Sequence, residues 1–282
     1  PNGSLRVMPQ LARLRIWGCY PTTAAWADGM EEMGDFDFPS ILEEIAWGGG
    51  LADLARTLTR LEIVDTDYGV LYTGRRSVDD NTDYHRIHPF IFPFHTMIGG
   101  SIDEKNMLTS YNGKAWVPMD DNNTLILEWQ LRPAKPWSDE ERAQLLKVRN
   151  AQGFLPDNGQ PGGRWRLAAN STNNYMLDYE LQKTKLFFGV LSNPLQDGAV
   201  QESMGPVYDR SKEHLGTADA MIIRVRRRLI EAAKALRDKG AEPPCVSDHS
   251  MYRLRPVGAI LPKGADWMVE TAERRKAFYQ PA

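Results

Sequence analysis

The segment that decides the fold runs from Thr217 to Lys239 and reads TADAMIIRVRRRLIEAAKALRDK. Its apolar side chains recur at intervals of three or four residues, at Ile222, Val225, Leu229, Ala233 and Leu236. This spacing places one apolar stripe along a helix, with Arg, Lys and Glu on its other faces. Thr217 can cap the start of the helix, and Gly240 can end it. The segment therefore predicts a long amphipathic helix that lies across the concave face of a sheet.

The sheet is predicted from the residues before this helix, beginning at about residue 59. Short runs rich in aliphatic and aromatic residues alternate there with polar turns, without a strand–helix–strand rhythm. The expected strands include residues 61–63, 68–72, 84–94, 115–118 and 124–131, with turns at 65–67 and 120–123. Pro89 and Pro93 indicate that 84–94 is an edge strand or a bulged strand. We expect an α+β domain of the helix-grip type, like START and Bet v 1-like domains, over residues 51–282.

Shorter helices and an irregular N-terminal segment complete the predicted organisation. Ser138 and Glu141 form a capping box that should begin a helix reaching about Arg149. Residues 174–183 and 197–204 are each expected to form a short helix. Residues 1–50 show no clear period, and we expect them to be irregular.

The bulk composition excludes several classes of protein. The 282 residues are 42% hydrophobic and 25% charged, with a net charge of −3. This balance argues against a nucleic-acid binder, and the basic run at 224–228 is interpreted as a solvated helix face. No apolar run approaches the roughly 20 residues of a membrane helix. Cys19 and Cys245 lie far apart and fit a reducing, cytosolic setting better than a disulfide framework.

Several motifs occur in a fixed order over about residues 59–240. The longest covers 196–219 and reads QDGAVQESMGPVYDRSKEHLGTAD. The others are DTDYG at 65–69, PFHTMI at 93–98, and NNYMLD at 173–178, the last followed by Gln182 and Phe188-Gly189. Together these motifs resemble the C-terminal catalytic domain of Rieske-type aromatic-ring oxygenases of the phthalate 4,5-dioxygenase kind.

This resemblance implies O₂-dependent hydroxylation of an aromatic carboxylate at a mononuclear Fe(II) held by two His and one carboxylate. In the family, an N-terminal Rieske [2Fe–2S] domain delivers the electrons, a reductase supplies them, and the subunits commonly form trimers. The position of the carboxylate ligand matches Asp197. The residues alone also allow Asp197 to be an ordinary helix N-cap, because it follows Asn193-Pro194.

Two parts of the family pattern are not found in this sequence. A Rieske cluster needs two Cys and two His in paired spacing, which Cys19 and Cys245 do not supply, so no [2Fe–2S] cluster is expected in this chain. The family's His-x₄-His iron ligands should precede residue 65, yet the first histidine is His85. Residues 20–22 and 36–39 are faintly similar to the end of a Rieske domain and its linker, so 1–50 can be a remnant of both.

Three histidines lie close together in the predicted strand, at His85, His88 and His95. Residues three apart in a strand point to opposite faces. His85 and His88 are therefore poorly placed to share a metal ion unless a bulge intervenes. Hydrogen-bonded histidines on a pocket-forming strand are the favoured interpretation.

Two further groups of candidate residues each allow a functional and a purely structural interpretation. Asn174, Asp178 and Gln182 would share one face of a helix, where they either line a channel near the iron or form a plain polar face. A second group could bind a substrate carboxylate or could be solvated arginines at a strand edge: Arg75, Arg76 and Arg86.

Two functions follow from these observations. The first is the catalytic-domain portion of an aromatic ring-hydroxylating oxygenase, expected to be incomplete because the Rieske ligands and the iron-binding His pair are not found. The second is a catalytically inactive relative that binds an aromatic ligand or serves in a homo-oligomer.

Overall fold

A computed structural model describes residues 60–132, 137–150, 153–160, 163–190, 193–205 and 207–277. These residues belong to two compact units. The larger unit contains most of the sheet, the long helix and the C-terminal segment, and the smaller unit contains most of residues 135–213. The expectation for residues 1–50 lies outside the described residues.

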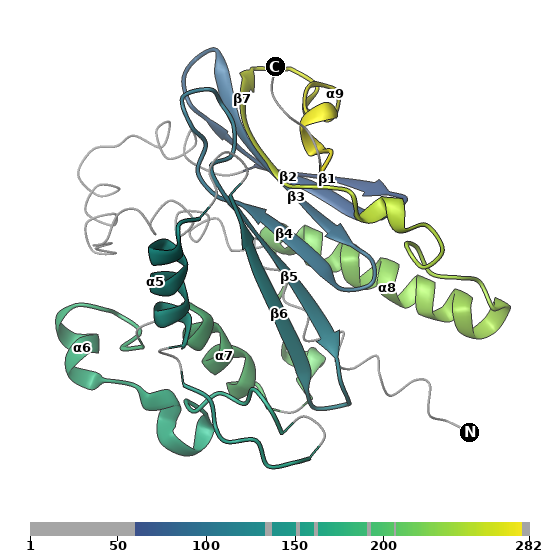
Figure 1. Cartoon of the computed structure of the whole chain (residues 1–282). Coiled ribbons are helices and arrows are strands. Elements are labelled where there is room, and N and C mark those ends of the chain that lie inside the picture. The colour runs from purple at the N-terminus through teal and green to yellow at the C-terminus, as the bar shows by residue number, and fades with distance from the viewer. Residues whose placement is uncertain are drawn as a thin grey trace. The chain divides into compact units, whose positions relative to one another are not determined.

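The larger unit is built on an antiparallel sheet of seven strands (Figure 1). The strands are β1 (Arg60–Thr66), β2 (Gly69–Ser77), β3 (Thr82–Ile91), β4 (His95–Gly99), β5 (Tyr111–Pro118), β6 (Thr124–Leu131) and β7 (Val257–Pro262). The first six follow one another in chain order across the sheet, and β7 pairs with β3. The predicted antiparallel meander and the α+β helix-grip class are confirmed.

β3 is a central strand, so the edge-strand prediction for 84–94 was wrong. Residues 82–87 of β3 pair with β7, whereas Phe90 and Ile91 pair with β4. Pro89 lies in the interval between these two ladders. A proline lacks the N–H that a ladder needs, and the sheet accepts it here because the neighbouring strand changes at this point.

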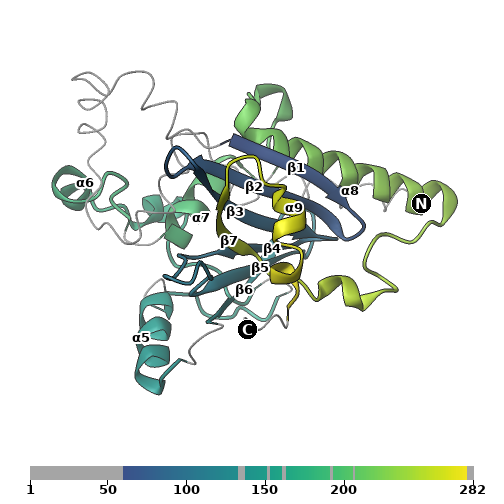
Figure 2. The same cartoon turned by 90° about the horizontal axis from the view of Figure 1, so that it is seen from above.

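The two faces of the sheet carry helices of different length. The long helix α8 (Ala220–Lys239) lies on one face, and the short helix α9 (Trp267–Glu270) lies on the other (Figures 1 and 2). Gly240 ends α8 with a φ of 63°, as expected. The start differs from the prediction, because Thr217–Asp219 form the short 3₁₀ helix η3 before α8 begins.

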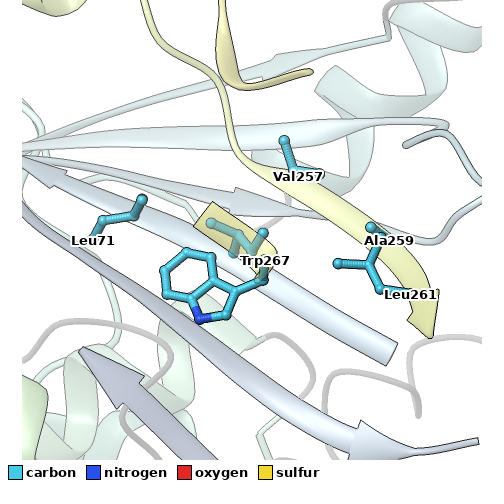
Figure 3. Packing of buried hydrophobic residues seen from close by; sticks show 6 residues of the cluster. Leu71, Val257, Ala259, Leu261 and Trp267 are labelled. Carbon is cyan, nitrogen blue, oxygen red and sulfur yellow. The ribbon is translucent and has the colours of Figure 1, made fainter. Parts of the chain in front are cut away.

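An apolar cluster fills the α9 face (Figure 3). Its buried members are Leu71, Ile87, Val257, Ala259, Leu261 and Trp267. Trp267 donates a hydrogen bond from Nε1 to Glu62 Oε2 over 2.9 Å, which holds α9 against β1. Because successive side chains in a strand alternate, the neighbours of Leu71 and Ile87 in β2 and β3 point to the α8 face.

The smaller unit is mostly helical. Its elements are α5 (Asp139–Asn150), η1 (Ser171–Met176), α6 (Tyr179–Thr184), α7 (Asn193–Ser203) and η2 (Arg210–Lys212). The predicted capping box is present, since Ser138 N donates to Glu141 Oε2 and Glu141 N donates to Ser138 Oγ. Two further 3₁₀ turns, η4 (His249–Tyr252) and η5 (Glu273–Arg275), belong to the larger unit. Within the described residues, no helix is long and apolar enough to cross a membrane.

Candidate functional site

The DTDYG motif forms the turn between β1 and β2 and fastens α8 to the sheet. Asp65 accepts two hydrogen bonds from the Arg224 guanidinium, at 2.8 and 2.6 Å. Arg228 donates to the carbonyl oxygens of Thr66 and Gly69. The hydrogen bond from Arg224 lowers the pKa of the Asp65 carboxyl. The interpretation of the basic run as only a solvated helix face is therefore wrong for Arg224 and Arg228.

Gly69 ends the same motif because no side chain fits there. A Cβ atom at this position would collide with the backbone carbonyl of Phe90 on β3. Glycine therefore allows β2 and β3 to approach closely at the turn. The motif thus has a structural explanation that is independent of any ligand.

The histidines of β3 point to opposite faces, as their spacing predicted. His85 pairs across the sheet with Ala259, a member of the α9-face cluster. His88 pairs with Tyr72 of β2, which lies next to Leu71 and points the other way. His95 starts β4, where its ring packs edge-on against Tyr252.

On the α8 face, hydrogen-bonding groups sit among buried aromatic rings. The Tyr72 hydroxyl lies 2.8 Å from His88 Nδ1, and the two rings meet edge to face. Trp116 Nε1 donates to Thr96 Oγ1 over 3.1 Å. Thr96 is the cross-strand partner of Phe90, so these groups share one face with His88. This face therefore places specific polar atoms among buried aromatic side chains, and polar groups set in an apolar lining are also the chemistry of ligand sites.

Burial keeps the His88 imidazole neutral. Its side chain is 4% exposed, and desolvation lowers its pKa well below the usual value. The positive charge of Arg86, two residues away in β3, lowers the pKa further. Arg86 is held in place by hydrogen bonds from Nε and Nη2 to the carbonyl oxygen of Gly99.

On the α9 face, His85 lies among charges. Its Nδ1 is 3.3 Å from Thr73 Oγ1. Arg75 forms ion pairs with Glu62 and Asp83 beside it. Burial lowers the pKa of His85, while the carboxylates of Glu62 and Asp83 act in the opposite direction. Arg75 is thus engaged in the sheet, which removes it as the first choice for a substrate carboxylate.

Asp197 lies in the second turn of α7 and not at its start. The helix begins at Asn193, because a proline in the first helical turn costs no hydrogen bond. The N-cap interpretation of Asp197 is therefore wrong. The residue is half-buried, and its Oδ2 atom is shielded from solvent.

Asn174, Asp178 and Gln182 do not share a helix face. Asn174 and the two residues after it have positive φ values of 52°, 56° and 53°, so the predicted helix over 174–183 is wrong in its first half. Asparagine side chains compete for the backbone there, as Asn170 and Asn173 form a capping box. Asp178 is the N-cap of α6, accepting hydrogen bonds from Glu180 N and Leu181 N.

Gly189, in the predicted Phe188-Gly189 motif, is required by the same local structure. Its φ is 63°, and a Cβ atom would approach Asp178 O to 2.7 Å. The Asp178 N–H donates to Gly189 O. The conformation of the NNYMLD segment therefore depends on glycine at this position.

The described residues do not fit the expected iron. No group of three His, Cys, Asp or Glu side chains among them could hold a metal ion. His85 and His88 are on opposite faces of the sheet, and all five histidines of the chain lie at or after residue 85. A facial set of two imidazoles and a carboxylate is thus not assembled by this part of the chain.

Comparison with known proteins decides the family. The family model described as LigXa C-terminal domain like matches residues 46–280. The chain belongs to the LigXa C-terminal domain-like family. The matched range contains the whole sheet, α8 and α9, so the described fold is the fold of this LigXa-like domain.

Two curated relatives of this LigXa-like chain are oxygenase subunits. It is 27% identical to the 3-chlorobenzoate-3,4-dioxygenase oxygenase subunit of Comamonas testosteroni over an alignment of 304 positions, which covers 97% of this chain and 67% of the relative. It is 27% identical to the phthalate 4,5-dioxygenase oxygenase subunit of Pseudomonas putida, covering 74% of this chain and 45% of the relative. The resemblance to oxygenase subunits of aromatic ring-hydroxylating dioxygenases is confirmed.

The Tyr72–His88 pair was not found by sequence reasoning. The two residues are separated by 16 positions, and only the β2–β3 register brings them together. The sequence did indicate that His88 faces away from His85. It gave no signal for the hydroxyl partner.

Proposed function

We propose that this chain is the substrate-binding, catalytic-domain portion of an oxygenase subunit that acts on an aromatic carboxylic acid. The observation that carries the proposal is the family match over residues 46–280 together with the two oxygenase relatives. The fold supports it, because the α8 face of the sheet combines buried aromatic rings with polar atoms. The reaction proposed for the complete assembly is O₂-dependent hydroxylation of the ring.

Such a reaction requires mononuclear iron and electrons from a Rieske cluster. The described residues do not supply the iron ligands. We propose that the active assembly includes a Rieske domain, a reductase and further copies of this chain. Asp197 is the residue of this chain that we propose as a ligand, and Asn174 and Asp178 as residues near it.

Iron binding tests this proposal directly. The chain is loaded anaerobically with Fe(II), and bound iron per chain is measured by mass spectrometry. Stoichiometric iron that is lost in Asp197→Ala and kept in Asp209→Ala would support an oxygenase site. Asp209 is a suitable control because it is an exposed acid in the same unit that caps η2. Uptake of O₂ with 3-chlorobenzoate or phthalate, in the presence of a reductase and a Rieske domain, is the matching activity measurement.

A second function is favoured by one specific observation, the lack of a three-ligand metal group in the described part of the chain. In this case the domain binds an aromatic acid, or contributes to a homo-oligomer, without chemistry of its own. Wild-type chain that takes up no iron but binds 3-chlorobenzoate in isothermal titration calorimetry would favour this function. Analytical ultracentrifugation would show whether it forms an oligomer.

A further inference from the structure

His88 has one ring nitrogen that is satisfied and one that is not. Its Nδ1 lies 2.8 Å from the Tyr72 hydroxyl. Its Nε2 is shielded from solvent and has no hydrogen-bond partner among the residues that the structure describes. Buried polar atoms in native proteins nearly always have a partner, so an exception calls for an explanation. A bound ligand would supply one.

The chemistry of the pair decides which kind of atom Nε2 needs. A phenol is a better hydrogen-bond donor than an imidazole N–H, and an imidazole nitrogen is a better acceptor than a phenol oxygen. This difference favours the Tyr72 O–H group as the donor to Nδ1. In a neutral imidazole the other nitrogen then carries the proton, so Nε2–H is a hydrogen-bond donor and requires an acceptor.

The surroundings of His88 favour an anionic aromatic ligand. Arg86 lies two residues away on the same face, and its charge acts on the His88 ring. The ring of Phe90 follows at the next position on this face, fully buried, and Trp116 lies on the same face across β4. A carboxylate would meet a donor and a positive charge here, while its ring would meet aromatic side chains.

We propose that His88 Nε2–H donates a hydrogen bond to a carboxylate oxygen of the aromatic acid, on the α8 face of the sheet. Tyr72 is the positioning residue that fixes the tautomer of His88. Arg86 contributes the positive charge that favours the anion. This inference rests on the proposed function and names the polar contact of the same site.

His85 provides a matched control within the same strand. It is 3% exposed, against 4% for His88, and its Nδ1 also meets a hydroxyl group, that of Thr73. It points to the α9 face, away from the proposed ligand. The variants His88→Phe and His85→Phe therefore remove similar side chains from opposite faces.

The binding experiment uses the full chain, free of iron, with 3-chlorobenzoate in isothermal titration calorimetry. A hydrogen bond to a charged group has a strength that corresponds to about a ten-fold change in affinity or more. We expect His88→Phe to weaken binding by about ten-fold and His85→Phe by less than about two-fold. Equal weakening by both variants would overturn the proposal, because the effect would then be one of folding.

A measurement on the wild-type chain keeps the proposal testable if the variants do not fold. Long-range ¹H–¹⁵N NMR spectra report the tautomer of each histidine. We expect the Nε2–H tautomer at His88, a shift of this nitrogen with 3-chlorobenzoate, and no such shift with chlorobenzene. In Tyr72→Phe we expect a mixture of tautomers. An Nδ1–H tautomer at His88 in the wild type, or no shift of Nε2 with 3-chlorobenzoate, would overturn the proposal.

These outcomes are distinct from those that test the proposed function. Binding that depends on His88, but without iron uptake or O₂ consumption, would overturn the oxygenase function and leave this contact in place. Oxygenase activity that is unchanged in His88→Phe would overturn this contact and leave the oxygenase function in place. Failure of the wild type to bind 3-chlorobenzoate or phthalate would overturn the contact.

Discussion

The two faces of the central sheet place buried histidines in different surroundings. On the α9 face, His85 lies beside an apolar cluster closed by Trp267 and among paired charges from Arg75 and its two carboxylate partners. On the α8 face, His88 bonds to Tyr72 and leaves a second nitrogen without a partner in the described residues. We interpret the first arrangement as one that stabilises the fold. In the second, the buried Nε2 lowers stability because it lacks a protein partner, and a ligand can bind to it.

The strongest test of this contrast removes the centre of the α9 face. We expect Trp267→Ala to lower the free energy of unfolding by about 3–5 kcal/mol, because a large buried ring is replaced by a cavity. Urea denaturation measures this loss. The control Val269→Ala, an exposed residue of the same helix, should change stability by less than about 0.5 kcal/mol. Equal effects would show that α9 is not packed on the sheet.

A smaller effect is expected from breaking the polar pair on the α8 face. Tyr72→Phe leaves the buried His88 Nδ1 without its donor and should cost about 1–3 kcal/mol. The double variant Tyr72→Phe/His88→Phe should recover part of this loss, since both polar partners are then apolar. Thr73→Val is the control on the other face, where the contact to His85 is longer. A double variant less stable than Tyr72→Phe would contradict this account.

Acidification should distinguish the effects of the two histidines on stability. Burial lowers the pKa of both in the folded state, so the unfolded chain binds protons first as the pH falls below about 6.5. Stability is thus complete above that pH and declines below it, by at most about 1.4 kcal/mol per pH unit for each histidine. The decline should be reduced more by His88→Phe than by His85→Phe, because nearby carboxylates offset the effect at His85. Urea denaturation at several pH values tests this ranking.

The smallest effect concerns the ion pair that joins α8 to the β1–β2 turn. Asp65→Asn should cost about 0.2–1 kcal/mol, because the pair is partly exposed to solvent. The lowered pKa of Asp65 means that its contribution is present above pH 4 or so and is lost as the pH falls through the folded-state pKa. The effect should shrink at high salt. Glu231→Gln, which removes the partner of Arg227 on the same helix, should have a still smaller effect.

Periodic features of the sequence predicted the fold well, but they could not predict which side chains meet across neighbouring strands. The apolar spacing of 217–239 predicted α8, and the alternation of strand side chains separated His85 from His88. The Tyr72 partner of His88 depends on register, which local sequence does not specify. The error at 174–178 arose because asparagine side chains accept hydrogen bonds from backbone N–H groups there, and these bonds replace those of a regular helix. The error at Asp197 arose because Pro194 opens a helix as readily as it ends one.

The pairing of β7 with β3 has a consequence for how the chain is made. Ile87 is the partner of Val257, so the middle of the sheet is completed by residues that lie 170 positions later in the sequence (257 against 87). Contacts between such distant residues form late and slow the folding of a protein. During synthesis, β3 emerges long before β7 and keeps an unpaired edge that can join other chains. A chain that stops before residue 257 would retain that edge, so we expect truncation there to yield aggregates even though α8 and the first six strands are present.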